Sequence, residues 1–197
     1  MNPRRLRLLA ITLPLVSSSI AFLAWSQPWV QVRLADGRGL VAAGDVAAPA
    51  IPPLAIAALA LVGALALAGV VFRVILGVLQ AFRGAGIAAS GLLATADPVQ
   101  SAAATITAAT GVEGLESVRA LVESATTTVW PAVAIVAGLL AVVIGLGIAI
   151  TASRWPLRPR RFDAVRLAPI DGGGDALAPD RQDAWDALSD GDDPTAR

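Results

Sequence analysis

Arg83 is the residue whose type and position could do chemistry, because it lies inside an otherwise apolar segment, residues 74–96, three positions after Gln80. An arginine in hydrocarbon is expensive and by default marks a functional site. No carboxylate within a predicted span could pair with it. Its long side chain could instead extend toward the cytoplasmic face near Val74, about 13 Å of helix rise away. We favour this second interpretation and keep the functional one open.

The composition leaves little other chemistry. The 197 residues include no Cys, His, Tyr or Lys, so the usual general bases, thiolate nucleophiles and metal ligands are missing. We find no phosphate-binding loop, catalytic dyad or nucleic-acid motif, and the Asp171–Asp175 segment lacks the ligand spacing of a calcium loop. We therefore expect no enzyme activity, no cofactor, no metal and no nucleic-acid partner.

Lipid is the expected solvent for most of the chain. Hydrophobic residues make up 56%, charged residues 15%, and the mean hydropathy is +0.70, well away from an average soluble domain. A membrane-spanning helix needs about 20 apolar residues. The sequence predicts an all-α integral membrane protein whose four spans lie at about residues 8–25, 51–72, 74–96 and 130–152.

Charge at the ends of the spans predicts their orientation. All 15 basic residues are Arg, and they are matched by 15 acids, but the two signs are segregated. Arg clusters precede the first span and follow the last, which places both termini in the cytoplasm. An even number of crossings satisfies both clusters, and Arg73 then marks a tight inner turn. We expect a multi-pass protein of the cell membrane.

A cleaved signal peptide is the alternative for the N-terminus. Residues 4–7 resemble its basic region, and residues 8–16 resemble its apolar region. However, the apolar stretch continues to Trp25, and Ser19-Ile20-Ala21 is only a fair cleavage site. Loss of this span would also leave an odd number of crossings.

The first outer loop, residues 27–50, predicts a short β-hairpin. Residues 29–34 alternate in polarity, Asp36-Gly37 is a turn signal, and residues 40–43 can return. Trp25 and Trp29 bracket the expected membrane surface, where indole rings favour the headgroups, and Pro28 lies between them. These three residues are functional candidates.

The second outer loop, residues 98–129, is rich in Ala and Thr. Residues 112–124 have apolar positions at helical spacing, which predicts a short amphipathic helix that caps the bundle or binds a partner.

Small residues recur every four positions along two spans, at Gly77, Ala81, Ala85 and Ala89 and at Ala141, Gly145 and Ala149. Such stripes let helices approach closely in lipid. They fit packing within one chain as well as oligomerisation, so an oligomer stays possible.

The C-terminal region, residues 154–197, forms the second predicted domain after a membrane domain at residues 1–153. Its first part is a basic patch that would attract anionic headgroups, at Arg154, Arg158, Arg160 and Arg161. The rest is acidic and rich in Gly and Pro, which predicts a disordered tail. A solvated tail is the default expectation; alternatively, Trp185 and Leu188 could form one apolar helical turn that folds back on the basic patch or binds a cytosolic protein.

Several segments resemble the tryptophan-associated (Trp biosynthesis-associated) transmembrane proteins of actinobacteria. The most specific are Trp-Ser-Gln-Pro-Trp at 25–29 and Trp-Asp-Ala-Leu-Ser at 185–189, supported by residues 44–54, 154–156, 161–163 and 192–195. The resemblance covers nearly the whole chain. It implies a cytoplasmic-membrane location and a link to tryptophan biosynthesis, and it supplies no catalytic residues.

Two functions follow as expectations. The first is an accessory or scaffold protein that tethers tryptophan-pathway enzymes through its tail, including Trp185. The alternative is a small transporter or exporter of tryptophan or a related aromatic metabolite, in which Arg83 meets a carboxylate.

Overall fold

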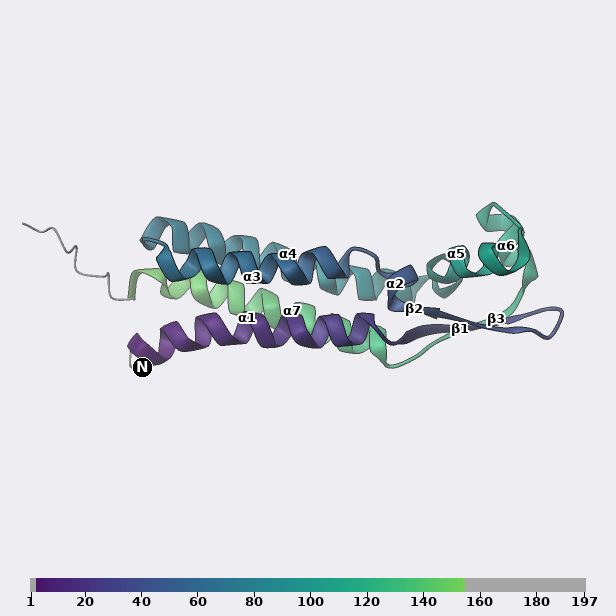
Figure 1. The fold of residues 1–197 in the computed structure, drawn as a ribbon, viewed down its shortest axis with the longest axis horizontal. Helices are drawn as coiled ribbons and strands as arrows, with labels where there is room; N and C mark the ends of the chain where they lie inside the picture. The colour runs from purple at the N-terminus through teal and green to yellow at the C-terminus, as the bar shows by residue number, and fades with distance from the viewer. Residues whose placement is uncertain (1–2, 155–197) are drawn as a thin grey trace, which may run out of the picture. The chain divides into compact units, whose positions relative to one another are not determined.

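Four long helices lie side by side and carry a small cap at one end (Figure 1). The computed structural model describes residues 3–154, with side chains placed from Leu8 to Ser153. The chain divides into two compact units, residues 1–157 and 158–197, and the described residues belong to the first. The long helices are α1 (Pro3–Trp25), α3 (Ile51–Leu67), α4 (Val70–Ala96) and α7 (Trp130–Thr151).

The cap consists of the shorter elements between these helices. They are β1 (Pro28–Leu34), β2 (Gly39–Ala43), α2 (Gly44–Ala47), α5 (Pro98–Thr110), α6 (Leu115–Leu121) and β3 (Val122–Thr127). A short 3-10 turn, η1 (Ala152–Arg154), ends the described chain. The cap lies at the bundle end where α1 and α4 end and where α3 and α7 begin.

The predicted membrane-type helices are confirmed, but three rather than four of the described helices are long and apolar enough to cross a membrane. In the described part of the chain, α1 from Leu8, α4 and α7 are long and apolar enough to cross a membrane. The helix α3 is apolar but has 17 residues, a rise of about 25 Å, which is shorter than typical hydrocarbon. Prolines occupy the first turns of α3 and α7, a position where the missing N–H costs no hydrogen bond.

The predicted boundary between the second and third spans was wrong. We expected a span at 51–72 and a turn at Arg73, whereas α3 ends at Leu67 and α4 already begins at Val70. Ala68 and Gly69 adopt extended backbone conformations between the two helices. The chain therefore reverses at these two residues, and Arg73 lies inside the first turn of α4. The third span is longer than predicted, 27 residues, so Arg83 lies at its middle.

A three-stranded antiparallel sheet of order β2-β1-β3 forms the cap's framework. The predicted hairpin is confirmed, with Val32 opposite Leu40 and Gly37 at positive φ in the turn. The third strand was not predicted: Gln31 pairs with Thr126, and Val32 pairs with Ala125. The expected helix at 112–124 was therefore too long, because the chain leaves α6 at Leu121 to join the sheet.

The helix α5 was also missed in a segment expected to be loop. Asp97 ends α4 and caps α5, since its carboxylate accepts a hydrogen bond from the backbone N–H of Gln100 at 3.0 Å. Pro98 follows at the first helical position, and Gly111 ends the helix at positive φ. The helix α5 packs on the sheet through Ala102 and Ile106, which are fully buried.

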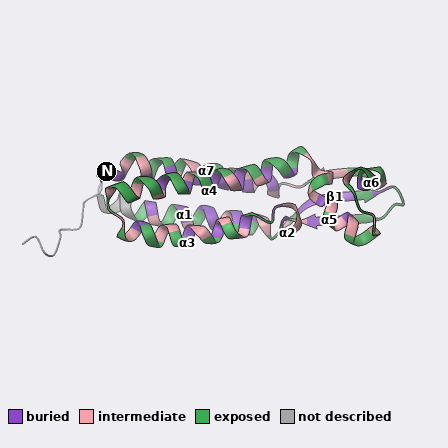
Figure 2. Ribbon diagram, turned by 90° about the horizontal axis from the view of Figure 1, so that it is seen from above, coloured by how far each residue is buried: buried purple, intermediate pink, exposed green. Residues whose placement is uncertain are grey.

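Exposure in the bundle follows the pattern expected in lipid. Figure 2 shows exposed residues along the outer sides of the four helices and buried residues between them. The exposed positions include large apolar side chains such as Leu67, Phe82 and Ile150, each more than 70% exposed. Contiguous apolar surface of this kind marks a membrane-embedded face.

Candidate functional site

The helices α1, α3, α4 and α7 share a level near the middle of the bundle. A small apolar cluster away from the cap joins the four helices through Ala10, Leu65, Leu76 and Ile148. Seven residues from each, toward the cap, lie Ser17, Ala58, Arg83 and Ala141, and all four are buried. Seven residues are two helical turns, a rise of about 10 Å. These residues therefore occupy one level.

Every buried polar residue among the described side chains lies at or next to this level. They are Ser17, Ser18, Gln80 and Arg83, which we call the polar layer. The two serines face inward from α1, and the other two face inward from α4. The other two helices contribute Ala58 and Ala141, both fully buried. Small residues on α3 and α7 thus leave space for the long side chains of α4.

Two hydrogen bonds hold the guanidinium of Arg83. Its Nε donates to Oε1 of Gln80 at 3.1 Å, and its Nη1 donates to the carbonyl oxygen of Leu54 at 3.2 Å. Leu54 lies in the first turn of α3, which is the end nearer the cap. Arg83 is 5% exposed, and these bonds to its own helix and to α3 hold its side chain inside the bundle rather than extended to the cytoplasmic face.

Two donors of this pair have no acceptor in the structure. They are Nη2 of Arg83 and Nε2 of Gln80, and both atoms are buried. The sequences of α1, α3, α4 and α7 contain no Asp or Glu, so no carboxylate of these helices neutralises the guanidinium. Buried polar groups normally find partners, and a buried charge is costly without one. The pair is therefore suited to hold an anionic or carbonyl oxygen.

The serines of the layer use their hydroxyl protons locally. Ser17 and Ser18 both donate to the carbonyl oxygen of Pro14, at 3.0 Å and 2.7 Å. Pro14 lies inside α1 and has no N–H to give to the preceding turn. The hydroxyl oxygens keep lone pairs, so these serines can still accept a hydrogen bond.

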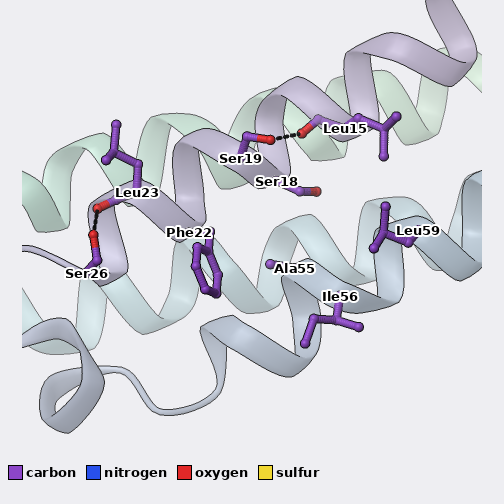
Figure 3. Close-up of a pocket in the computed structure, with 9 residues that line it drawn as sticks. All are labelled: Leu15, Ser18, Ser19, Phe22, Leu23, Ser26, Ala55, Ile56 and Leu59. Carbon is purple, nitrogen blue, oxygen red and sulfur yellow. Dashed lines mark hydrogen bonds between the residues drawn. The ribbon is translucent and has the colours of Figure 1, made fainter.

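A groove between α1 and α3 approaches the polar layer. Its volume is about 380 Å³, within the usual range for small-molecule sites. Figure 3 shows side chains from both helices around it, among them Phe22, Leu15 and Ile56, with Ser18 and Ala55 between the helices. Ser18 belongs to the polar layer, and Ala55 follows Leu54. The groove is thus mostly apolar and reaches the polar layer at Ser18.

The opposite side of the bundle is a close-packed seam between α4 and α7. Glycines face each other there without side chains between them: a Cβ on Gly138 would lie 2.5 Å from the backbone nitrogen of Ala88, and a Cβ on Gly84 would lie 2.6 Å from the carbonyl oxygen of Gly138. The predicted small-residue stripes are thus used within the chain. The four-residue stripe was wrong in part, because Ala85 and Ala89 are exposed and the seam runs through Gly77, Gly84 and Gly91.

The candidates Trp25, Pro28 and Trp29 form the junction of bundle and cap. Trp29 is fully buried, and its indole N–H donates to the carbonyl oxygen of Ala24 at 2.7 Å. It therefore does not lie among headgroups as predicted, because its ring fills the core of the cap. The Trp25 ring is half-buried and contacts Phe22 at 5.2 Å between centroids.

Two residues that sequence reasoning missed complete this junction. Thr128 donates its hydroxyl proton to the carbonyl oxygen of Pro28 at 2.7 Å, which ties the end of β3 to the start of β1. Gly44 packs against the backbone of Trp25, and a Cβ there would lie 2.3 Å from the Trp25 carbonyl oxygen. A glycine after an apolar strand was the available signal. The Trp185 candidate and the basic patch beyond Arg154 lie outside the described residues.

These features define a transmembrane helical protein with a small mixed cap. The chain belongs to the family described as tryptophan-associated transmembrane protein, which matches residues 11–195. The suspected resemblance is thereby confirmed over nearly the whole chain. No curated protein and no solved structure matches it.

Proposed function

We propose that the protein is a non-enzymatic accessory protein of the cell membrane that supports tryptophan biosynthesis. The family assignment over residues 11–195 supports the link to tryptophan. The observation that carries the accessory role is the seam between α4 and α7, where backbone contacts at Gly84 and Gly138 leave no passage between the two helices. A bundle of this kind is suited to anchor its flanking regions.

The proposed topology has four crossings: the three long apolar helices and the shorter α3. The cap lies outside the cell. The 17 residues of α3 suit a locally thinned bilayer, which lowers the cost of a short helix. Arg residues lie on both flanks that we assign to the cytoplasm, and the α3–α4 turn is followed by Arg73. The region after Arg154 then faces the tryptophan-pathway enzymes, with Trp185 as the contact and the basic patch on anionic lipid.

A deletion strain tests this role. We expect it to grow more slowly than the parent without tryptophan and equally well with it, and a plasmid with the intact chain restores growth. The Trp185→Ala chain, matched in expression, should restore less growth and recover fewer tryptophan-pathway enzymes on purification. Equal growth of the parent and the deletion strain without tryptophan would contradict the proposal.

A transporter of tryptophan or a related aromatic metabolite is the second candidate. The unpartnered donors of Arg83 and Gln80 at mid-bundle favour it, because transporters place ionisable groups at this depth. The measurement is tryptophan flux in vesicles that contain the intact chain or Arg83→Gln. If the protein transports tryptophan through Arg83, flux should be faster in vesicles with the intact chain than in vesicles with Arg83→Gln. Equal flux in the two kinds of vesicle would reject this function.

A further inference from the structure

We propose that Arg83 and Gln80 form a binding site, inside the bundle, for a small monocarboxylate with an apolar body. The proposal goes beyond the accessory role and does not depend on it. It shares Arg83 with the transporter alternative, but binding requires no transport. It rests on the open donors of the pair, the charge of the surrounding helices and the groove between α1 and α3.

The two open donors lie on either side of one hydrogen bond. Nη2 and Nε of Arg83 share the guanidinium carbon, and Nε2 and Oε1 of Gln80 share the amide carbon. Since Nε donates to Oε1 at 3.1 Å, the two open donors belong to directly hydrogen-bonded groups. Both side chains are more than nine-tenths buried, so their positions are fixed by packing. A carboxylate has two oxygens and can accept from both donors.

Charge selects an anion. The guanidinium carries a positive charge, and α1, α3, α4 and α7 contribute no acid to balance it. Attraction between opposite charges is much stronger at low dielectric than in water, so a carboxylate in this layer would be held firmly. The absence of acids from these four helices disfavours a zwitterion, because its ammonium group would find neutral hydroxyl, amide and carbonyl oxygens and no carboxylate.

The groove between α1 and α3 supplies the place for the apolar body. Its lining is aromatic and aliphatic, with Phe22, Leu15 and Ile56, and its volume of about 380 Å³ suits a single ring system. It reaches Ser18 in the polar layer and Ala55, the neighbour of Leu54 (Figure 3). The groove lining includes neither Leu54 nor Arg83, so the carboxylate of a ligand in the groove meets the pair only after the first turn of α3 has moved.

The first turn of α3 is the wall that must move. In the present structure protein atoms cover both open donors. The helix α3 begins without a side-chain cap at Ala50, and it lacks the glycine seam that joins α4 to α7. Displacement of Leu54 frees Nη1 of Arg83 as well, so the carboxylate replaces a carbonyl with a charged acceptor.

Equilibrium dialysis of the purified full chain in detergent against radiolabelled benzoate tests the site. Benzylamine and tryptophan serve as competitors, since the first carries a cation and the second a zwitterion. We expect saturable binding of one benzoate per chain, displaced by unlabelled benzoate and poorly displaced by the other two. The absence of saturable binding, or stronger displacement by tryptophan than by benzoate, would overturn the proposal.

Variants locate the site. Arg83→Gln removes the positive charge and the guanidinium donors, so it should weaken benzoate binding by at least about tenfold; Gln80→Leu removes one open donor, Nε2, and should weaken it several-fold. The control is Arg33→Gln, which removes an exposed arginine of the cap and should leave binding unchanged. If Arg83→Gln fails to fold, Gln80→Leu decides. Unchanged binding in folded Arg83→Gln or Gln80→Leu contradicts the assignment.

Discussion

The bundle and the cap bury different kinds of side chain. The buried positions of α4 and α7 are mainly Gly and Ala, such as Gly84, Gly138 and Ala141. The core of the cap is built from large side chains, with Trp29, Leu34 and Ile106 all below 2% exposed. One chain thus uses two packing strategies, and the change occurs at the Trp25–Trp29 junction.

The surrounding solvent explains the difference. In water, burial of a large apolar side chain stabilises a fold by roughly 25 cal/mol per Å², so a core of Trp, Ile and Leu is favoured. In lipid, the tails are as apolar as leucine, and helices associate through close packing and hydrogen bonds instead. Large apolar residues of the bundle, such as Phe82, accordingly point outward.

The two regions also place their charged side chains differently. Ion pairs of the cap are solvent-exposed, as between Arg33 and Glu123 at 3.7 Å, and such pairs contribute little. Arg83 has the same chemistry in the bundle without an acid, so its environment makes it a candidate site.

The largest expected effect is in the cap, from Trp29→Ala. The substitution removes a fully buried indole and its hydrogen bond to Ala24, and we expect the free energy of unfolding to fall by about 4 kcal/mol. Chemical denaturation of the purified chain, followed by far-UV circular dichroism, measures it. Trp25→Ala, at a half-buried position, is the control and should lose clearly less; equal losses would contradict this role for Trp29.

In the bundle, Gly138→Ala should be the most damaging small change. The added Cβ would lie 2.5 Å from the backbone of Ala88, so the helices must separate, at a loss of about 2 kcal/mol. Gly147→Ala is the matched control, because no atom lies within 4 Å of its Cβ position. Comparison of thermal unfolding midpoints decides; a seam that tolerates Gly138→Ala as well as Gly147→Ala is not close-packed.

Thr128→Val tests the strap between β3 and β1 at the base of the cap. It removes the hydroxyl that donates to Pro28 but keeps the shape of the side chain, and we expect a loss of about 1 kcal/mol. Thr126→Val, on the exposed face of the same strand, should be near neutral. Urea denaturation measures the free energy of unfolding of both variants. An equal loss in the two would show that the Thr128–Pro28 hydrogen bond does not stabilise the cap.

The smallest effect is a pH dependence at the hairpin turn. Hydrogen bonds from the backbone N–H and guanidinium of Arg38 lower the pKa of the Asp36 carboxyl. A lowered folded-state pKa stabilises the cap above the unfolded pKa of about 4, and the benefit is lost as the pH falls through the folded value. Asp36→Asn should therefore unfold slightly more easily at neutral pH, and the difference should vanish in acid. A difference that grows in acid would contradict this sign.

Local signals in the sequence predicted the elements that depend on neighbouring residues. Asp36-Gly37 marks the hairpin turn, and Pro131 marks the start of α7, because turn and helix-start preferences act over a few residues. Uncharged stretches likewise located α1 and α7. The turn between α3 and α4 was misplaced at Arg73 because the charge was taken as the boundary, whereas the chain leaves the helix at Ala68 and Gly69 through extended backbone.

Long-range partners could not be read from the sequence. The residues of β3 form a strand because β1 offers them an edge, and Gln31 and Thr126 are far apart in the chain. The long-range partner of Arg83 is likewise not marked by residue type: it is the backbone carbonyl of Leu54, and every residue has a backbone carbonyl. The sequence located Arg83 and Gln80 together, but the depth of the pair, its burial and its open donors depend on how four helices pack.

Labelling of single cysteines tests the central claim of four crossings most directly. The chain has no cysteine, so one can be placed at Thr126 in the cap or at Gly69 between α3 and α4, both exposed. With a membrane-impermeant maleimide, we expect Thr126→Cys to be labelled in intact cells and Gly69→Cys only after permeabilisation. Labelling of Gly69→Cys in intact cells, or protection of Thr126→Cys, would contradict the four-crossing topology.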